Sequence, residues 1–172
     1  MVEINLTKNG GPSRHRFNYR GQHRYIVSMR TYRRNRVFAD REVVMVLLNI
    51  LREACWHHQF VVHAYCCLPD ELILVIRGKT ERSELKAFLR TLRGNARQQI
   101  IIPDGVELWN KTYTERVLRK TEDTRDIVRG VFTVPVTRGL AATIKEYPFS
   151  GSFVEEQVID KEHRDRAPRR NQ

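Results

Sequence analysis

Arginine and aromatic side chains alternate along one stretch near the start of the chain. Residues 14–36 contain no aspartate or glutamate. The arginines of this stretch are Arg14, Arg16, Arg20, Arg24, Arg30, Arg33, Arg34 and Arg36, and the aromatic residues between them are Phe17, Tyr19, Tyr25 and Tyr32. Guanidinium groups bind phosphates and aromatic rings stack on bases, so this combination favours nucleic acid over a membrane. A solvated basic face would carry the same charges, but the net charge of +11 for the whole chain shifts the interpretation toward a polyanionic partner.

A second basic pattern lies in the middle of the chain. Lys86, Arg90, Arg93 and Arg97 are four, three and four residues apart, which places them on one face of a helix. Such a helix is either an ordinary amphipathic surface helix or a face that follows phosphates, and the sequence leaves both readings open. Residues 116–120 form a further short basic segment.

The cysteines and one strand histidine are candidates for holding a metal or acting as a base. Cys55, Cys66 and Cys67 lack metal-ligand spacing such as CxxC, so we expect small core residues in a reducing compartment. His63 lies in an apolar strand, where a histidine is more often a hydrogen-bonded core residue than a ligand or base.

Two adjacent acidic residues, Asp70 and Glu71, follow Pro69. Neighbouring side chains diverge in a strand, so we expect turn chemistry and a solvated strand start rather than a paired-carboxylate site. His57 and His58 fall at the predicted end of a helix, where cations are favourable.

The elements that would position these side chains centre on an apolar hairpin over residues 61–78, with its turn at Pro69 and Asp70. The predicted elements are a strand over 23–31, a helix from an Asp40 cap to about residue 57, strands near 60–67 and 72–77, a helix from a Ser83 cap, a short strand over 100–105, and a helix from Glu122 toward Pro135. This order predicts an α+β, ferredoxin-like antiparallel sheet with helices packed on one face.

The length of 172 residues suits one domain. We expect a flexible leader over 1–13, a domain over 14–153, and a charged, disordered tail over 154–172. No apolar run approaches the roughly 20 residues of a membrane span, and no apolar leader occurs, so we expect a cytoplasmic protein without a membrane partner.

Several phrases of the sequence together resemble the REP-associated tyrosine transposases, bacterial relatives of the single-tyrosine insertion-sequence transposases. These phrases are RYIVSMRTYRRNRVFAD from Arg24, AYCCLPDELILVIRG from Ala64, SELKAFLRTLRGNARQ from Ser83, LWNKTYTERVLRKTED from Leu108, PVTRGL from Pro135 and EYPFSGS from Glu146. The resemblance covers roughly residues 14–153, and the order and spacing of the phrases make it more specific than any single motif.

The resemblance implies a site whose reactive residues are all replaced in this chain. The family phrase MPDHxHLLV holds a divalent ion with two histidines on one strand face, and those positions are Glu71 and Ile73 here. The family phrase YxxxNP supplies a tyrosine nucleophile and an asparagine ligand, and those positions are Gly130 and Val134. An active relative would use Mg²⁺ or Mn²⁺, whereas we expect no cofactor and no catalytic residue here. Ile73 is expected to be buried.

The sequence therefore predicts a transposase-like protein that binds hairpin or single-stranded DNA and has lost strand cleavage. The predicted DNA-binding residues are Arg33, Arg34, Arg36, Lys86, Arg90, Arg93, Arg97, Arg116 and Arg119. One alternative is an active metal-dependent nuclease or transposase that uses Glu71 with His63 or Tyr113. Another is an RNA-binding or protein-interaction module, with Tyr25 and Tyr65 as stacking candidates. Some relatives are dimers, and the sequence leaves monomer and homodimer open.

Overall fold

The computed structural model describes residues 17–102 and 106–154 as a mixed fold built on one antiparallel sheet. Its strands are β1 (Arg24–Arg30), β2 (Phe60–Leu68), β3 (Glu71–Gly78), β4 (Thr114–Val117) and β5 (Ser150–Gly151), in the spatial order β4-β1-β3-β2-β5. The first four strands have the ferredoxin-like order, which confirms the predicted α+β class. The predicted leader and all but the first residue of the predicted tail lie outside the described residues.

The hairpin of β2 and β3 forms the centre of the sheet. Pro69 and Asp70 make the turn, and the pairing begins at once between Leu68 and Glu71. The other side of β3 pairs with β1, so that Arg30 lies opposite Glu71 and Ser28 opposite Ile73. Both neighbours of β3 are therefore strands, and its backbone is hydrogen-bonded on both edges.

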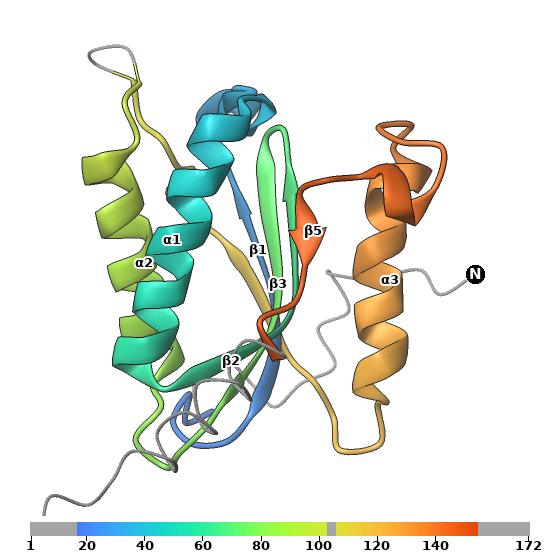
Figure 1. Ribbon diagram of the computed structural model, residues 1–172. Helices are drawn as coiled ribbons and strands as arrows, with labels where there is room; N and C mark the ends of the chain where they lie inside the picture. The colour runs from blue at the N-terminus through green and yellow to red at the C-terminus, as the bar shows by residue number, and fades with distance from the viewer. Residues whose placement is uncertain (1–16, 103–105, 155–172) are drawn as a thin grey trace, which may run out of the picture.

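Helices cover both faces of this sheet. Helices α1 (Arg41–His58) and α2 (Leu85–Gln99) pack on one face, against Leu72, Leu74 and Ile76 of β3. Helix α3 (Thr124–Thr137) packs on the other face, against Ile73 and Val75 (Figure 1). The prediction of helices on one face thus holds for α1 and α2 and is wrong for α3. The reason is visible in β3, where apolar residues follow one another without alternation, as in strands that are buried on both faces.

Local signals fix some element boundaries and not others. Helix α1 begins where predicted, because the Asp40 side chain accepts a hydrogen bond from the Glu42 backbone N–H at 2.8 Å. The cap of α2 is Glu84 and not Ser83, since the Glu84 carboxylate accepts from the N–H groups of Lys86 and Ala87. The Ser83 hydroxyl is buried instead and donates to the Gln59 carbonyl at 2.6 Å.

The fourth strand lies later in the chain than predicted. Residues 100–102 are not in a strand, and residues 103–105 lie outside the described part. Ile100 is buried after the end of α2, and Ile101 is almost fully exposed. Strand β4 occupies the edge of the sheet beside β1. It pairs antiparallel with Tyr25–Ser28, so its strand conformation depends on residues far away in the sequence. Among the described residues, no helix is long and apolar enough to cross a membrane.

Candidate nucleic-acid interface

Glu71 is a buried carboxylate at the first position of β3. Its side chain has no exposed surface and lies on the α3 face of the sheet, as Ile73 does. The Ser28 hydroxyl donates a hydrogen bond to Oε1, and Nη2 of Arg138 donates to Oε2 at 2.8 Å. The predicted solvated strand start is therefore wrong. Position 71 is already paired with strands on both sides, and the end of α3 covers it.

Two further arginines face the same carboxylate. Nε of Arg30 lies 3.6 Å from Oε1, and Nη1 of Arg34 lies 3.6 Å from Oε2. Arg34 also pairs through Nε with Asp70 at 2.8 Å. The arginine side chains are 54%, 46% and 34% exposed for Arg30, Arg34 and Arg138. Three guanidinium groups thus meet two carboxylates, and the group, which we call the Glu71 cluster, carries excess positive charge.

The electrostatics of the cluster keep Glu71 ionised. Burial by itself raises the pKa of this carboxyl group, because it disfavours the charged form. The hydrogen bonds from Ser28 and Arg138, together with the charges of Arg138 and Arg30, outweigh burial and hold the pKa of Glu71 below its ordinary value. The carboxylate is therefore a permanent anion at neutral pH.

An unusual backbone turn brings Arg34 to this cluster. Arg33 and Arg34 have φ values of 51° and 59°, in the left-handed region that costs an L residue roughly 1–2 kcal/mol. Both residues belong to the 3-10 turn Tyr32–Arg34 that follows β1. The ion pair of Arg34 with Asp70 helps to hold this conformation. Residue 33 is also placed by its side chain, which lies over the Tyr32 ring.

The face of α3 that looks at the sheet carries no reactive group at the two family positions. Gly130 is buried, and Val134 is half-buried against the apolar core beneath α3. Arg138 follows one further turn along the same face. Ile73 is fully buried, which confirms the expectation for it.

These residues do not fit the divalent ion that the resemblance implies. Ile73 and Val134 offer no lone pair, and the Glu71 oxygens already accept hydrogen bonds from Ser28 and Arg138. In the part of the chain that the structure describes, no group of three or more His, Cys, Asp or Glu side chains could hold a metal ion. The cation beside position 71 is instead the guanidinium of Arg138.

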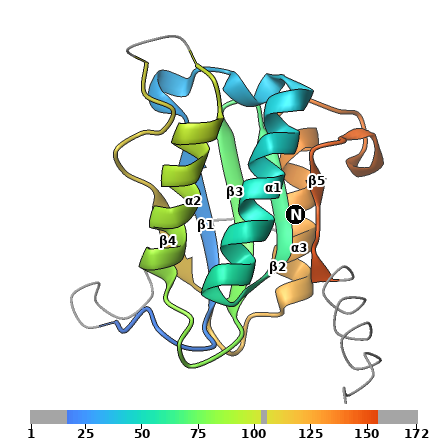
Figure 2. The same cartoon turned by 60° about the vertical axis from the view of Figure 1, so that its left-hand side comes forward.

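The predicted DNA-binding residues fall into three groups that are separate in space. Arg33, Arg34 and Arg36 are exposed at one end of the sheet, after β1 and beside the hairpin turn. Arg116 in β4 and the exposed Arg119 that follows it lie toward the opposite end, where the Arg119 carbonyl accepts a hydrogen bond from Arg24 at the start of β1. The third group lies on α2, which packs beside α1 on one face of the sheet (Figure 2).

Several cations of the α2 group and of β4 are engaged in contacts within the protein. Arg93 is half-buried over the Tyr113 ring and donates to the Asn110 carbonyl. Arg97 pairs with Glu107 at 3.1 Å, an exposed pair that contributes little to stability. Arg116 is only 18% exposed and pairs with Glu122 at 2.7 Å. Arg116 and Arg93 therefore have clear structural roles.

The two tyrosines named as stacking candidates, Tyr25 and Tyr65, are packing residues. Tyr25 is fully buried under α1 and α2, and Tyr65 packs with Phe153 at a ring distance of 5.1 Å. Since helices cover both faces of the sheet, these rings are not a platform on which bases could stack. The RNA-binding alternative relied on Tyr25 and Tyr65 as exposed stacking rings, and the described surface does not present them in that way.

The alternative catalytic site, which would combine Glu71 with His63 or Tyr113, is not formed in the structure. Glu71 lies at the turn of the hairpin, whereas His63 lies toward its open end, next to the pair formed by Val62 and Ile76. Tyr113 packs on the α1 and α2 face, opposite the face that Glu71 occupies. Neither His63 nor Tyr113 therefore contacts Glu71.

Sequence reasoning missed Ser28, Arg30 and Arg138 as partners of Glu71. One signal could have indicated Arg138, because it follows Gly130 and Val134 at the same four-residue spacing and so shares their helix face. Ser28 and Arg30 could be assigned only once the register of β1 against β3 was known.

The structure is similar to that of a REP-associated tyrosine transposase bound to a REP hairpin. The two share 16% identity, the match covers 88% of this chain and 87% of that chain, and the TM-score is 0.69. It is also similar to a candidate transposase from Deinococcus radiodurans R1, with 25% identity, coverage of 66% and 90%, and a TM-score of 0.50. No protein family model and no curated protein matches the sequence. The similarities confirm the resemblance to the REP-associated tyrosine transposases, and the first shows a shared fold.

Proposed function

We propose that this chain is a transposase-type DNA-binding protein that recognises hairpin or single-stranded DNA and does not cleave it. DNA recognition is supported by the fold that the chain shares with a transposase bound to a REP hairpin, and by the exposed arginines that follow β1 and β4 and lie on α2. The loss of cleavage comes from the four replaced positions, Glu71, Ile73, Gly130 and Val134.

The ion pair between Glu71 and Arg138 is the observation that carries this proposal. Where the resemblance places a histidine and a metal ion, the chain has a carboxylate and a guanidinium 2.8 Å apart. A guanidinium supplies positive charge and hydrogen bonds to a phosphate, but it has no open coordination position for water or a leaving oxygen. Gly130 supplies no nucleophile. This arrangement supports binding of a phosphate backbone without its transfer.

Fluorescence anisotropy tests the binding half of the proposal. A labelled DNA hairpin and a duplex of matched sequence are titrated at about 50 mM and about 200 mM salt, because phosphate contacts release counterions and weaken steeply between these concentrations. We expect tighter binding of the hairpin and a steep loss of affinity at the higher salt. Absence of hairpin binding at low salt would overturn the proposal.

A pair of variants shows whether the predicted surface is used. Arg33→Ala with Arg36→Ala removes two exposed cations beside the hairpin turn, and we expect weaker binding with a salt slope reduced by about 1.5–2. Arg82→Ala is the matched control, since Arg82 is an exposed cation at the other end of β3, before α2. Equal effects of the two changes would contradict the placement of the surface.

A labelled-oligonucleotide assay tests the proposed loss of DNA cleavage. We expect neither cleavage nor a covalent protein–DNA adduct in Mg²⁺ or Mn²⁺. Cleavage that disappears in Glu71→Gln would identify an active site and refute the loss of chemistry, while the binding result would stand.

A further inference from the structure

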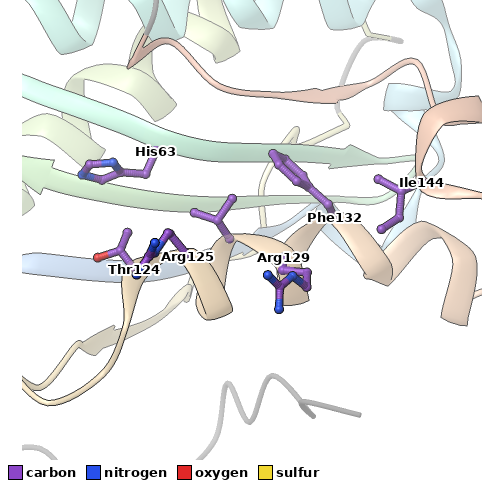
Figure 3. Close-up of a pocket in the computed structure, with 7 residues that line it drawn as sticks. His63, Thr124, Arg125, Arg129, Phe132 and Ile144 are labelled. Atoms are coloured by element: carbon purple, nitrogen blue, oxygen red, sulfur yellow. The ribbon is translucent and has the colours of Figure 1, made fainter.

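A pocket of about 440 Å³ opens between α3 and the outer part of β2, away from the Glu71 cluster. Figure 3 shows His63 at one end and Phe132 with Ile144 at the other, and Arg125 and Arg129 extend from α3 along its side. The floor between them is apolar and includes Val128. A volume of this size lies in the range of roughly 300–1,000 Å³ that is usual for small-ligand sites.

His63 has a hydrogen-bonding atom to offer at this pocket. It sits at a β-bulge, where the register of β2 against β3 shifts between Val62 and Ala64. Its Nε2 atom is buried in the wall and has no hydrogen-bond partner among residues 17–102 and 106–154. Rotation about the soft terminal torsion of the ring can turn this atom toward a ligand. A buried ring nitrogen without a partner is costly, and a ligand that satisfies it gains accordingly.

The ring of His63 is neutral. Burial lowers its pKa, and the positive charges of Arg77 and Arg24 lower it further. A neutral imidazole has one donor and one acceptor nitrogen, as the edge of a nucleobase has both kinds of group.

Two arginines flank the open side of the pocket, each beside an aspartate. Arg125 and Arg129 lie one turn apart on α3, and their side chains are 87% and 74% exposed. Their partners are Asp123 at 3.0 Å and Asp126 at 3.6 Å. Exposed pairs of this kind contribute little to stability, so a phosphate can replace the carboxylates at small cost.

We propose that this pocket binds one unpaired nucleotide of the bound DNA. The base lies against Phe132 and the aliphatic side chains of Val128 and Ile144, and its edge faces His63. Its phosphate lies at Arg125 and Arg129. An aromatic wall, a neutral hydrogen-bonding ring and two flanking arginines together match a nucleotide better than a purely apolar or purely anionic ligand. The inference rests on the proposed function and gives it a second contact site.

Abasic scanning of the DNA tests this site. Hairpins with a short single-stranded extension on the 5′ or the 3′ side carry an abasic residue at one extension position at a time, and affinity is measured by fluorescence anisotropy. We expect one position at which loss of the base weakens wild-type binding by at least about fivefold. Phe132→Leu keeps most of the apolar volume and removes the aromatic face, and His63→Ala removes the ring. In both variants the effect of that position should shrink to less than about half, as expected for coupled partners.

The controls separate this site from the proposed function. Trp56→Leu removes an exposed aromatic residue of α1, on the opposite face of the sheet, and should leave the abasic effect unchanged. A blunt hairpin without extension should bind wild type, Phe132→Leu and His63→Ala equally well. If the blunt hairpin binds but no extension position matters, or if the abasic effect persists in both variants, the pocket assignment is refuted and the proposed function stands. If no hairpin binds the wild type at low salt, both are refuted.

Discussion

Replacement of Glu71 by glutamine removes one buried charge and almost no volume. The amide oxygen of Glu71→Gln can still accept a hydrogen bond from Ser28, so the change acts mainly on the three arginines. The short contact to Arg138, at 2.8 Å, is a hydrogen bond between two charged groups, for which about 1.5–3 kcal/mol is typical. The contacts of Arg30 and Arg34, at 3.6 Å and on half-exposed side chains, add less than about 1 kcal/mol each.

The expected loss is therefore about 2–4 kcal/mol of unfolding free energy at pH 7. Removal of one partner from a fully buried ion pair would cost about 3–5 kcal/mol. The loss expected here is smaller than for a fully buried pair, because all three arginines can turn toward solvent when the carboxylate is gone.

The stability difference between wild type and Glu71→Gln should become smaller as the pH falls. The pKa of Glu71 in the folded protein lies below its ordinary value of 4.5, so the folded state binds fewer protons at this group than the unfolded chain. Its contribution is fully present above about pH 4.5 and is lost as the pH falls through the lower, folded-state pKa. The difference between wild type and Glu71→Gln should shrink in acid.

Urea unfolding at pH 7 and at a series of pH values below 4.5 measures this difference. Glu53→Gln is the control, because Glu53 is an exposed residue of α1 and its change should stay within about 0.5 kcal/mol. A Glu71→Gln protein as stable as wild type at pH 7, or a difference that is unchanged in acid, would refute the account of the Glu71 cluster.

Three other expectations concern packing, thiol chemistry and metal dependence. In α2, Gly94→Ala should stabilise the protein by about 0.5–1 kcal/mol in urea unfolding, because a Cβ at this position has no neighbour within 4 Å. Gly78→Ala should destabilise by about 1–3 kcal/mol, because its Cβ would lie 2.1 Å from the Gly21 carbonyl oxygen; reversed signs would contradict the packing of this turn. Burial raises the pKa of Cys55 and of Cys66 to about 12, so a thiol-specific chromogenic reagent at pH 8 should modify them only after unfolding. DNA affinity should be equal in EDTA and in Mg²⁺ at constant ionic strength, and a strict requirement for Mg²⁺ would contradict a cluster built from arginines.

Elements with strong local signals could be predicted from the sequence. The turn at Pro69 and Asp70 and the cap at Asp40 depend on neighbouring residues alone, and both are where the sequence indicates. The fourth strand could not be predicted in this way, because Thr114–Val117 is short and half-buried and its strand character comes from pairing with β1. Apolar residues 100–102 carry the stronger local strand signal, yet Ile100 packs under α2.

The environment of Glu71 depends on residues distant in the chain. Ser28 reaches it across the sheet, and Arg138 reaches it from α3, over a separation of 67 residues. A glutamate after a Pro-Asp turn is ordinarily solvated, and only the packing of α3 on that face makes it a buried anion. The residues Ile73, Gly130 and Val134 could be assigned because the phrase resemblance fixes their positions, and Ile73 is buried as expected.

The contact of Arg138 with Glu71 also bears on the changes that would be needed to build a metal site here. Histidines introduced at positions 71 and 73 would leave Arg138, Arg30 and Arg34 without their shared carboxylate, and a divalent ion between the imidazoles would face a guanidinium at short range. Metal binding at this position would thus require a third substitution, because a divalent ion would otherwise add positive charge beside the guanidinium. We expect a protein with Glu71→His and Ile73→His to bind Mn²⁺ in isothermal titration calorimetry only when Arg138→Ala is added; Mn²⁺ binding without it would show that the guanidinium is no barrier. On this account, residue 138 decides whether this face of the sheet could hold a divalent ion.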